Sequence, residues 1–223
     1  MTDIITLSDP RVAGVAQDEC GEPLVDLRGS AGAGLRLDRR QADDQGSYAH
    51  LRSGVLRRLV RAQRLLPAGV RFLVVEGYRP PELQRRYFEQ YAATMRRTHP
   101  GASPERIREL ASAYISPPEV APHVSGGAVD LTLCDRDGRE LPLGTEVNAT
   151  PEESAGACRT AAPGITAEAR ANRSLMARAL TSSGFVNYPT EWWHWSYGDR
   201  YWALLVDAPA ARYGPAAPPR PTA

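Results

Sequence analysis

Apolar side chains recur every three or four residues between positions 49 and 66, a spacing that predicts a helix ending before Pro67. The next segment, VRFLVVEGYR at 70–79, is short, apolar and rich in valine, as expected of a buried strand. It stops at Arg79, which two prolines follow. The first fifty residues show no comparable period, so we expect short strands and loops there, wrapped on the main body.

Two more helices are predicted after these prolines. The first is PELQRRYFEQYAATMRR, which opens with proline in its first turn. The second has Ser103 as its N-cap and Pro104 as its first residue, and it runs to about Ile115. The prolines within 116–122 require a loop, because proline cannot continue a helix interior.

The segment AVDLTLC at 128–134 alternates as a strand does. Valine and leucine at 129, 131 and 133 share one face, and Asp130 lies on the other. A carboxylate in an apolar strand is costly unless it is paired or binds a metal. Asp130 is therefore a candidate metal ligand, and a hydrogen-bonded pair with His123 or an arginine is the alternative.

The last third of the chain begins with a long connection over 135–165, a length typical of segments that serve a site. Thr166 is the predicted N-cap of a helix that ends at Gly184. Two aromatic strands are predicted near 192–197 and 200–206, joined by a turn at YGDR.

Helices followed by alternating strands predict an α+β fold in which an antiparallel sheet carries the site and helices flank it. We expect one domain over residues 1–208. The proline- and alanine-rich residues 209–223 are expected to be a disordered tail.

Composition narrows the classes of function. The 223 residues carry a formal net charge of +1, so no overall field favours nucleic acid or an anionic membrane. The N-terminus lacks the pattern of a secretory signal, and no apolar run approaches a membrane span, so we expect a cytoplasmic protein. Cys20, Cys134 and Cys158 show no metal-ligand spacing and are expected to be reduced thiols. A bridge between Cys134 and Cys158 remains an alternative.

The four histidines fall into two groups. His50 and His99 lie among polar residues and are expected at the surface. His123 stands seven residues before Asp130, at the start of HVSGGAVDL. His194 lies in EWWH, three residues after Glu191.

Two imidazoles and a carboxylate form the ligand set of a catalytic zinc, whose fourth position is left for water. His123, Asp130 and His194 are the candidate ligands of one Zn²⁺ ion, and Glu191 is the candidate base that takes the proton of that water. Residues 191 and 194 share a face only if the chain turns between them, so we place Glu191 in a loop and His194 in a strand. The alternative for EWWHW is an aromatic core strand whose histidine is satisfied by the backbone.

Arg79 is the fourth candidate. A rigid guanidinium at the end of a buried strand can stabilise the oxyanion that forms when water attacks a carbonyl. The alternative is a structural ion pair with Glu76.

Three segments in this order resemble the zinc D-Ala-D-Ala dipeptidases of the hedgehog and D-Ala-D-Ala metallopeptidase superfamily. They are EGYRP at 76–80, HVSGGAVDLTL at 123–133 and EWWH at 191–194, with a looser similarity in LVDLR at 24–28. The resemblance covers about residues 50–206. It implies the hedgehog/DD-peptidase-like fold, zinc on the three candidate ligands, Glu191 as catalytic base and Arg79 as the transition-state arginine. It also implies a small peptide as substrate, most simply D-alanyl-D-alanine.

Two departures from the family pattern bear on the substrate. Ala121 stands where the family usually has serine, and the segment LGTEVN ends in Asn148 where the dipeptidases have the aspartate that receives the substrate's ammonium. Asn148 is therefore a candidate substrate-binding residue, unless Glu146, Glu152 or Glu153 takes that role. A D,D-carboxypeptidase or another small-peptide hydrolase on the same zinc is the second hypothesis. A zinc-stabilised binding module without turnover is the third.

Overall fold

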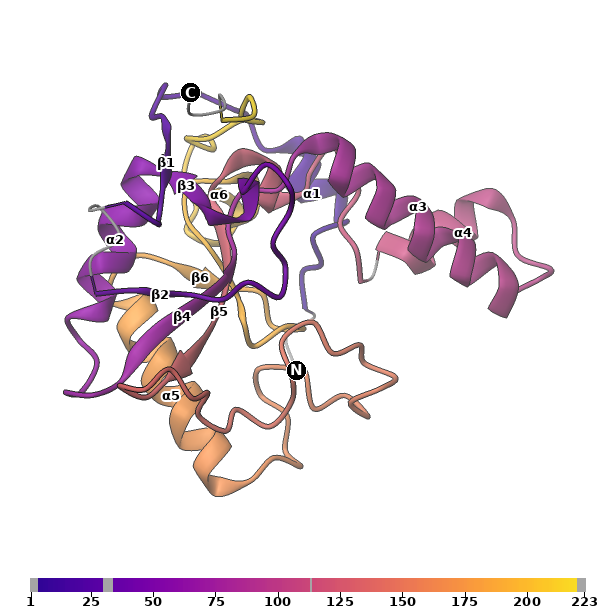
Figure 1. The fold of residues 1–223 in the computed structure, drawn as a ribbon. Coiled ribbons are helices and arrows are strands. Elements are labelled where there is room, and N and C mark those ends of the chain that lie inside the picture. Colours follow the sequence, from indigo (N-terminus) through magenta and orange to yellow (C-terminus); the bar gives the residue numbers. More distant parts are fainter. Residues whose placement is uncertain (1–3, 30–33, 113, 220–223) are drawn as a thin grey trace.

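The computed structural model describes residues 4–29, 34–112 and 114–219. Its centre is a five-stranded sheet of order β2-β4-β5-β7-β6 (Figure 1). The strands are β2 (Arg36–Leu37), β4 (Arg71–Glu76), β5 (Ala128–Cys134), β7 (His194–Ser196) and β6 (Val186–Asn187). Only β2 and β4 run parallel, and the other neighbours are antiparallel. The predicted α+β architecture with an antiparallel centre is therefore confirmed.

The main core lies on one face of this sheet. Every residue of β5 is buried, and its valine and leucines pack against the apolar residues of α2 (Ser53–Gln63) and α5 (Ala167–Thr181). The side chains of alternate residues point to the opposite face. Asp130 therefore leaves the core side of β5, as its place in the alternating pattern predicted.

A second, two-stranded sheet pairs β1 (Leu24–Asp26) with β3 (His50–Arg52). The helix expected from residue 49 therefore begins at Ser53, because residues 50–52 are used in this strand. His50 is buried, with its Nδ1 2.9 Å from the carbonyl oxygen of Gly46, so its expected surface position is wrong. His99, at the end of α3, is exposed as expected.

The N-terminal part includes a short helix, α1 (Pro10–Gly14), and the 3₁₀ turn η2 (Ser47–Ala49). The residues that follow β4 pack tightly on η2 and on the start of β3. Gly77 and Tyr78 donate backbone hydrogen bonds of 2.7 Å to the carbonyls of Tyr48 and His50. A Cβ atom on Gly77 would lie 2.3 Å from the His50 carbonyl oxygen, so this approach requires glycine.

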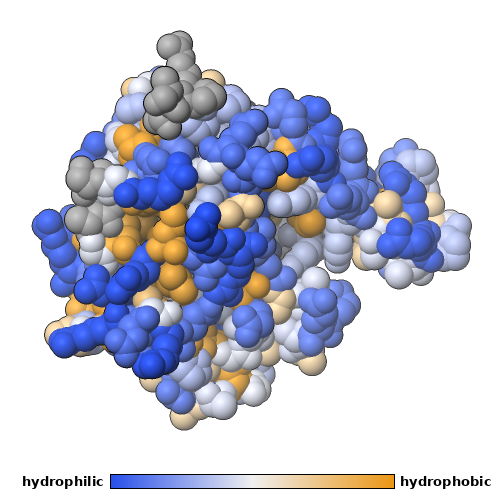
Figure 2. All heavy atoms as spheres, in the orientation of Figure 1, coloured by the Kyte–Doolittle hydropathy of each residue, from blue (hydrophilic) through white to orange (hydrophobic). Residues whose placement is uncertain are grey.

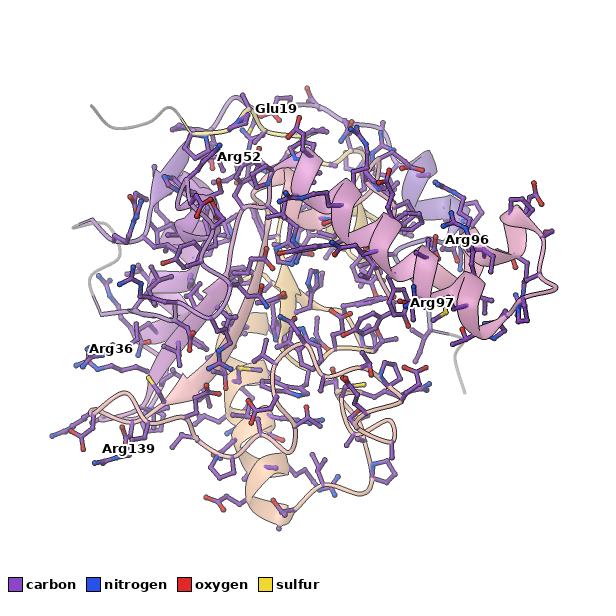
Figure 3. The ribbon with its side chains drawn as sticks, turned by 45° about the vertical axis from the view of Figure 1, so that its right-hand side comes forward. Glu19, Arg36, Arg52, Arg96, Arg97 and Arg139 are labelled. Carbon is purple, nitrogen blue, oxygen red and sulfur yellow. The ribbon has the colours of Figure 1, made fainter. Side chains whose placement is uncertain are left out.

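The helices α3 (Pro81–Thr98) and α4 (Pro104–Ser112) form a hairpin that projects from the body (Figure 1). Figure 2 shows it as a largely hydrophilic arm, and Figure 3 shows Arg96 and Arg97 on it, away from the sheet. A small core of its own, which includes Phe88 and Ile107, holds the two helices together. Ser103 accepts a hydrogen bond from the Arg106 amide at 3.2 Å, as the N-cap prediction requires.

The C-terminal part contains the largest secondary-structure error. Thr166 caps α5 as predicted, accepting from the Ala169 amide at 3.1 Å, but residues 200–205 form a helix, α6 (Arg200–Leu205), where a strand was expected. Asp199 starts this helix, because its carboxylate accepts a 2.6 Å hydrogen bond from the Trp202 amide. The aromatic residues that suggested a strand instead pack α6 against the body.

The residues after α6 pack on the molecule as far as the structure describes them. The amide of Ala216 donates to the Val124 carbonyl at 2.8 Å, and Tyr213 is buried with its hydroxyl 2.8 Å from Glu22. Arg52, beside Glu19 in Figure 3, donates to the Gly214 carbonyl at 3.0 Å. The disorder expected of residues 209–223 is therefore not found at 211–216, because buried side chains and backbone hydrogen bonds hold them. Residues 220–223 lie outside the described residues, and the domain boundary at 208 stays a prediction.

The sequence predicted reduced cysteines and no membrane-spanning segment. All three cysteines are free thiols, and Cys134 and Cys158 are both buried. Within the described part of the chain, no helix combines the length and apolar character needed to cross a bilayer.

Candidate metal centre and catalytic cavity

Strand register places three polar side chains in one row across the sheet. Asp130 on β5 is paired with His194 on β7 and with Glu76 at the end of β4. Directly paired residues on neighbouring strands project their side chains to the same face, about 5 Å apart. The three motifs of the sequence therefore meet on the side of the sheet that faces away from the main core.

His123 joins this row from the 3₁₀ turn η3 (Pro122–Ser125). The turn ends at Gly126, which has a φ of 68° that favours glycine. The ring Nδ1 of His123 lies 2.7 Å from the Gly77 carbonyl oxygen, and the Arg79 amide donates to the His123 carbonyl at 3.2 Å. Because a carbonyl oxygen can only accept, Nδ1 carries the hydrogen of the neutral ring, and Nε2 is left with a lone pair.

The side chains of His123, Asp130 and His194 converge on one point and are buried. Nε2 of His123 lies 3.2 Å from Nδ1 of His194 and 3.4 Å from Oδ2 of Asp130. Nδ1 of His194 lies 2.9 Å from Oδ1 of Asp130. Three acceptor atoms this close repel one another unless a proton or a cation lies between them. Two imidazole nitrogens and a carboxylate oxygen are ligands that Zn²⁺ prefers, so the residues fit the ion.

The pKa shifts of Asp130 and His123 show that each group stabilises the charged form of the other. Burial opposes the charge of Asp130, yet the neighbouring His123 and His194 hold the pKa of that carboxyl well below its usual range. Burial also opposes protonation of His123, but the carboxylate of Asp130 raises its pKa above the ordinary value. A positive charge is therefore favoured at this point, which is what a metal ion supplies.

Glu191 lies beside the cluster and not in it. It belongs to the loop before β7, and its Oε2 is 4.0 Å from Nδ1 of His194. The chain turns between Glu191 and His194, where the His194 amide donates to the Glu191 carbonyl at 3.2 Å, and both side chains lie on the same side. The side chain is only 14% exposed, and burial raises its pKa to about 7. A carboxyl group with such a pKa can both accept and return a proton near neutral pH.

Arg79 is held by two neighbours. Nε donates to Glu76 at 2.7 Å, Nη2 pairs with the other Glu76 oxygen, and Nη1 donates to Gln84 at 2.7 Å. The ion pair with Glu76, our alternative for this residue, is thus present. Since a guanidinium has five N–H groups, two remain, one on each terminal nitrogen. Arg79 also lines the cavity described next, so these two groups are available to a ligand there.

Gln84 is a site residue that the sequence did not suggest. Gln84 is only 1% exposed, and its side chain bridges Arg79 to the Ser116 carbonyl. Its Oε1 accepts from Arg79, and its Nε2 donates to the Ser116 carbonyl at 2.8 Å. Gln84 lies in the first turn of α3, a helix rich in polar and charged residues, so the hydrophobic pattern of the sequence does not mark it as buried. Only its position five residues after Arg79 could have suggested contact with that side chain.

The cluster opens into a cavity of about 360 Å³, within the range of small-molecule sites. Its walls include Arg79, Glu191, Tyr114, Ala121 and Asn148, together with the three candidate ligands.

Asn148 has a φ of 67°, and its carbonyl accepts a 2.7 Å hydrogen bond from the Tyr114 hydroxyl. Glu146, Glu152 and Glu153 are exposed, and none of them lines the cavity. Of the polar residues we considered for the substrate's amino group, only Asn148 reaches it.

Comparisons with known proteins identify the family of this chain. A family profile described as "D-ala-D-ala dipeptidase" matches residues 38–211. A D-alanyl-D-alanine dipeptidase of Synechocystis sp. is 30% identical over 83% of this chain and 85% of its own length. One from Enterococcus faecium is 31% identical over 63% of this chain and 69% of its own length.

Among solved structures, the LdcB LD-carboxypeptidase overlaps 95% of this chain and 88% of its own at 16% identity, with a TM-score of 0.48. That overlap is too loose to add to the family match. The profile itself spans all three segments on which the candidate site residues lie.

Proposed function

Because this chain belongs to the D-Ala-D-Ala dipeptidase family, we propose that it hydrolyses a short peptide, most simply D-alanyl-D-alanine, at the cluster of His123, Asp130 and His194. Family membership confirms the resemblance found in the motifs and the class of zinc metallopeptidase. The roles of individual residues are our proposal. The observation that carries it is the convergence of three buried ligand atoms within 4.8 Å of one another at the floor of a cavity.

In this proposal His123 binds zinc through Nε2, His194 through Nδ1 and Asp130 through its carboxylate. Zinc bound there would act as a Lewis acid, which lowers the pKa of a water molecule and polarises a carbonyl group. The Gly77 carbonyl fixes the tautomer and the orientation of the His123 ring.

Glu191 is the proposed general base and acid. Its carboxylate takes a proton from the attacking water and returns a proton to the nitrogen of the leaving amino acid. Burial, which raises its pKa to about 7, suits it to both steps.

Arg79 is proposed to stabilise the negative charge that develops on the carbonyl oxygen of the scissile bond. Its bonds to Glu76 and Gln84 fix the guanidinium plane before substrate arrives, so little reorganisation is needed during reaction. The two N–H groups left over point to a role in contacting this oxygen.

The test is whether zinc-loaded protein releases free alanine from D-Ala-D-Ala. Mass spectrometry detects the product, and L,D- and L,L-dipeptides are assayed in parallel. We expect hydrolysis of the D,D-dipeptide and loss of activity in Glu191→Ala with zinc content unchanged. Activity that survives in Glu191→Ala would contradict the mechanism. Zinc-loaded protein that cleaves none of these peptides would support the third hypothesis, a binding module.

One observation favours a second substrate class. The cavity wall offers the neutral amide of Asn148, and an amide pairs with an ammonium less strongly than a carboxylate does. A substrate whose amino group is blocked, as in a D,D-carboxypeptidase reaction, would suit this wall. Faster cleavage of N-acetyl-D-Ala-D-Ala than of the free dipeptide would favour this class, and Asn148→Asp should shift the preference back to the free dipeptide.

The cellular setting belongs to the proposal as well. A cell-wall-derived peptide is supported by the dipeptide that names the family. Location in the cytoplasm stays a prediction, and cell fractionation with antibodies against the protein tests it.

A further inference from the structure

Arg173 is a buried guanidinium that the proposed mechanism does not use. It lies on α5 with 4% of its surface exposed, and it makes no ion pair with any described residue. Its N–H groups donate instead to backbone carbonyls of one segment: Leu143 at 2.7 Å, Arg159 at 2.6 Å and Ala157 at 2.8 Å. A single side chain thus ties together both ends of the stretch 143–160.

Burying the charge of Arg173 costs free energy, because the guanidinium loses its contact with water. Burial lowers the pKa of Arg173 to about 10, so the group is still protonated at neutral pH. The carbonyl dipoles and the ring of Trp192, whose centroid is 5.3 Å from the guanidinium carbon, offset part of this cost. An apolar side chain would fill the space without that cost but could not hold three carbonyls.

The segment that Arg173 holds forms part of the catalytic cavity. It contributes Asn148 to the wall, and within 143–160 the structure has neither helix nor strand to fix it. Thr145, in the same stretch, accepts a 2.7 Å hydrogen bond from the indole of Trp192, the residue after Glu191. Arg173 therefore lies behind the wall and beside the loop that carries the proposed base.

We propose that Arg173 is a positioning residue that fastens the stretch 143–160 as the substrate-facing wall of the catalytic cavity, and so sets the affinity for the peptide. The inference rests on the proposed peptidase function. Arg173 itself contacts no reacting atom, and its effect passes through Asn148 and Trp192. Its loss should weaken substrate binding more than it slows the chemical step.

Arg170 offers a matched control on the same helix. Its guanidinium also donates to backbone carbonyls, those of Pro163 at 3.0 Å and Ile165 at 3.3 Å. These residues lie beyond the cavity wall, and neither Arg170 nor its partners line the cavity. Arg170→Gln removes carbonyl bonds of the same kind without releasing 143–160.

The experiment compares Arg173→Gln, Arg173→Lys and Arg170→Gln as zinc-loaded proteins with D-Ala-D-Ala. We expect Arg173→Gln to raise KM about 3- to 30-fold, the range typical of residues that couple to a site without touching the ligand, while kcat and zinc content stay near wild type. Arg173→Lys should be intermediate, because an ammonium keeps the charge but not the planar fork. Arg170→Gln should leave KM unchanged.

Amide hydrogen exchange tests the fastening without any hydrolysis. Exchange should accelerate within 143–160 in both Arg173 variants and not in Arg170→Gln. Unchanged KM despite faster exchange, or unchanged exchange in 143–160, would overturn the inference. If Arg173→Gln does not fold, Arg173→Lys carries both measurements. Wild-type protein that cleaves no peptide would refute the proposed function, whereas unchanged exchange would refute the fastening alone.

Discussion

Replacing Glu191 by glutamine separates the catalytic value of this carboxyl from its effect on stability. The change keeps the size of the side chain and removes its charge and its proton. If Glu191 is the general base, kcat should fall by about 10²- to 10⁴-fold, the usual contribution of such a group. Zinc binding should persist, because Glu191 is not among the three converging ligand atoms.

The same variant should be more stable than wild type at high pH. In the metal-free protein, burial raises the pKa of Glu191 from 4.5 to about 7. Between these values the folded protein holds a proton that the unfolded chain has released, so wild-type stability falls as pH rises through this window. The change in pKa corresponds to about 3 kcal/mol. Glu191→Gln lacks this penalty above pH 7.

Urea unfolding of both metal-free proteins, at about pH 4 and about pH 8, measures this difference. We expect the stability of the variant relative to wild type to increase by about 3 kcal/mol at the higher pH. Glu153→Gln, which changes an exposed glutamate, is the control and should show no comparable gain. A pH-independent difference would refute the burial argument, and near-normal turnover would refute the role as base.

Two further predictions concern the metal and Arg79. Asp130 raises the pKa of His123, so protons compete with zinc for the same ring nitrogen, and zinc affinity should fall as pH is lowered through that pKa. Competition with a chelating dye measures it, and an affinity that does not change between about pH 6 and pH 8 would contradict the ligand assignment. Arg79→Lys replaces a planar fork by a point charge that cannot reproduce the two parallel bonds to Glu76 together with the bond to Gln84, so kcat should fall about 10²-fold with zinc content unchanged. Turnover within about twofold of wild type would show that the fork is not needed.

The features that could be predicted from the sequence are those with local signals. Strand β5 and the helices α3 and α4, which begin with proline, could be predicted from the spacing of apolar residues and from the residues at helix starts. Both signals act within a few positions of the chain. The spacing of apolar residues does not predict that His123, Asp130 and His194 lie together, because their proximity depends on the pairing of β5 with β7. The order of the motifs supplied that information through the resemblance to a family.

What the sequence did not reveal depends on long-range contacts. Aromatic residues at 200–206 suggested a strand, but the Asp199 cap and packing against the body make it a helix. His50 looked polar and exposed, yet β3 buries it. The roles of Gln84 and Arg173 come from hydrogen bonds to residues five or more positions away, and neither stands in a recognisable motif. Propensity and pattern carry no information on such partners.

The proposed mechanism requires one zinc ion between His123, Asp130 and His194. An anomalous difference map, calculated from data collected on either side of the zinc absorption edge with crystals of the zinc-loaded protein, locates this ion. We expect a single strong peak about 2.0–2.2 Å from Nε2 of His123, Nδ1 of His194 and a carboxylate oxygen of Asp130. Zinc found at other residues, with no peak among these three, would contradict it.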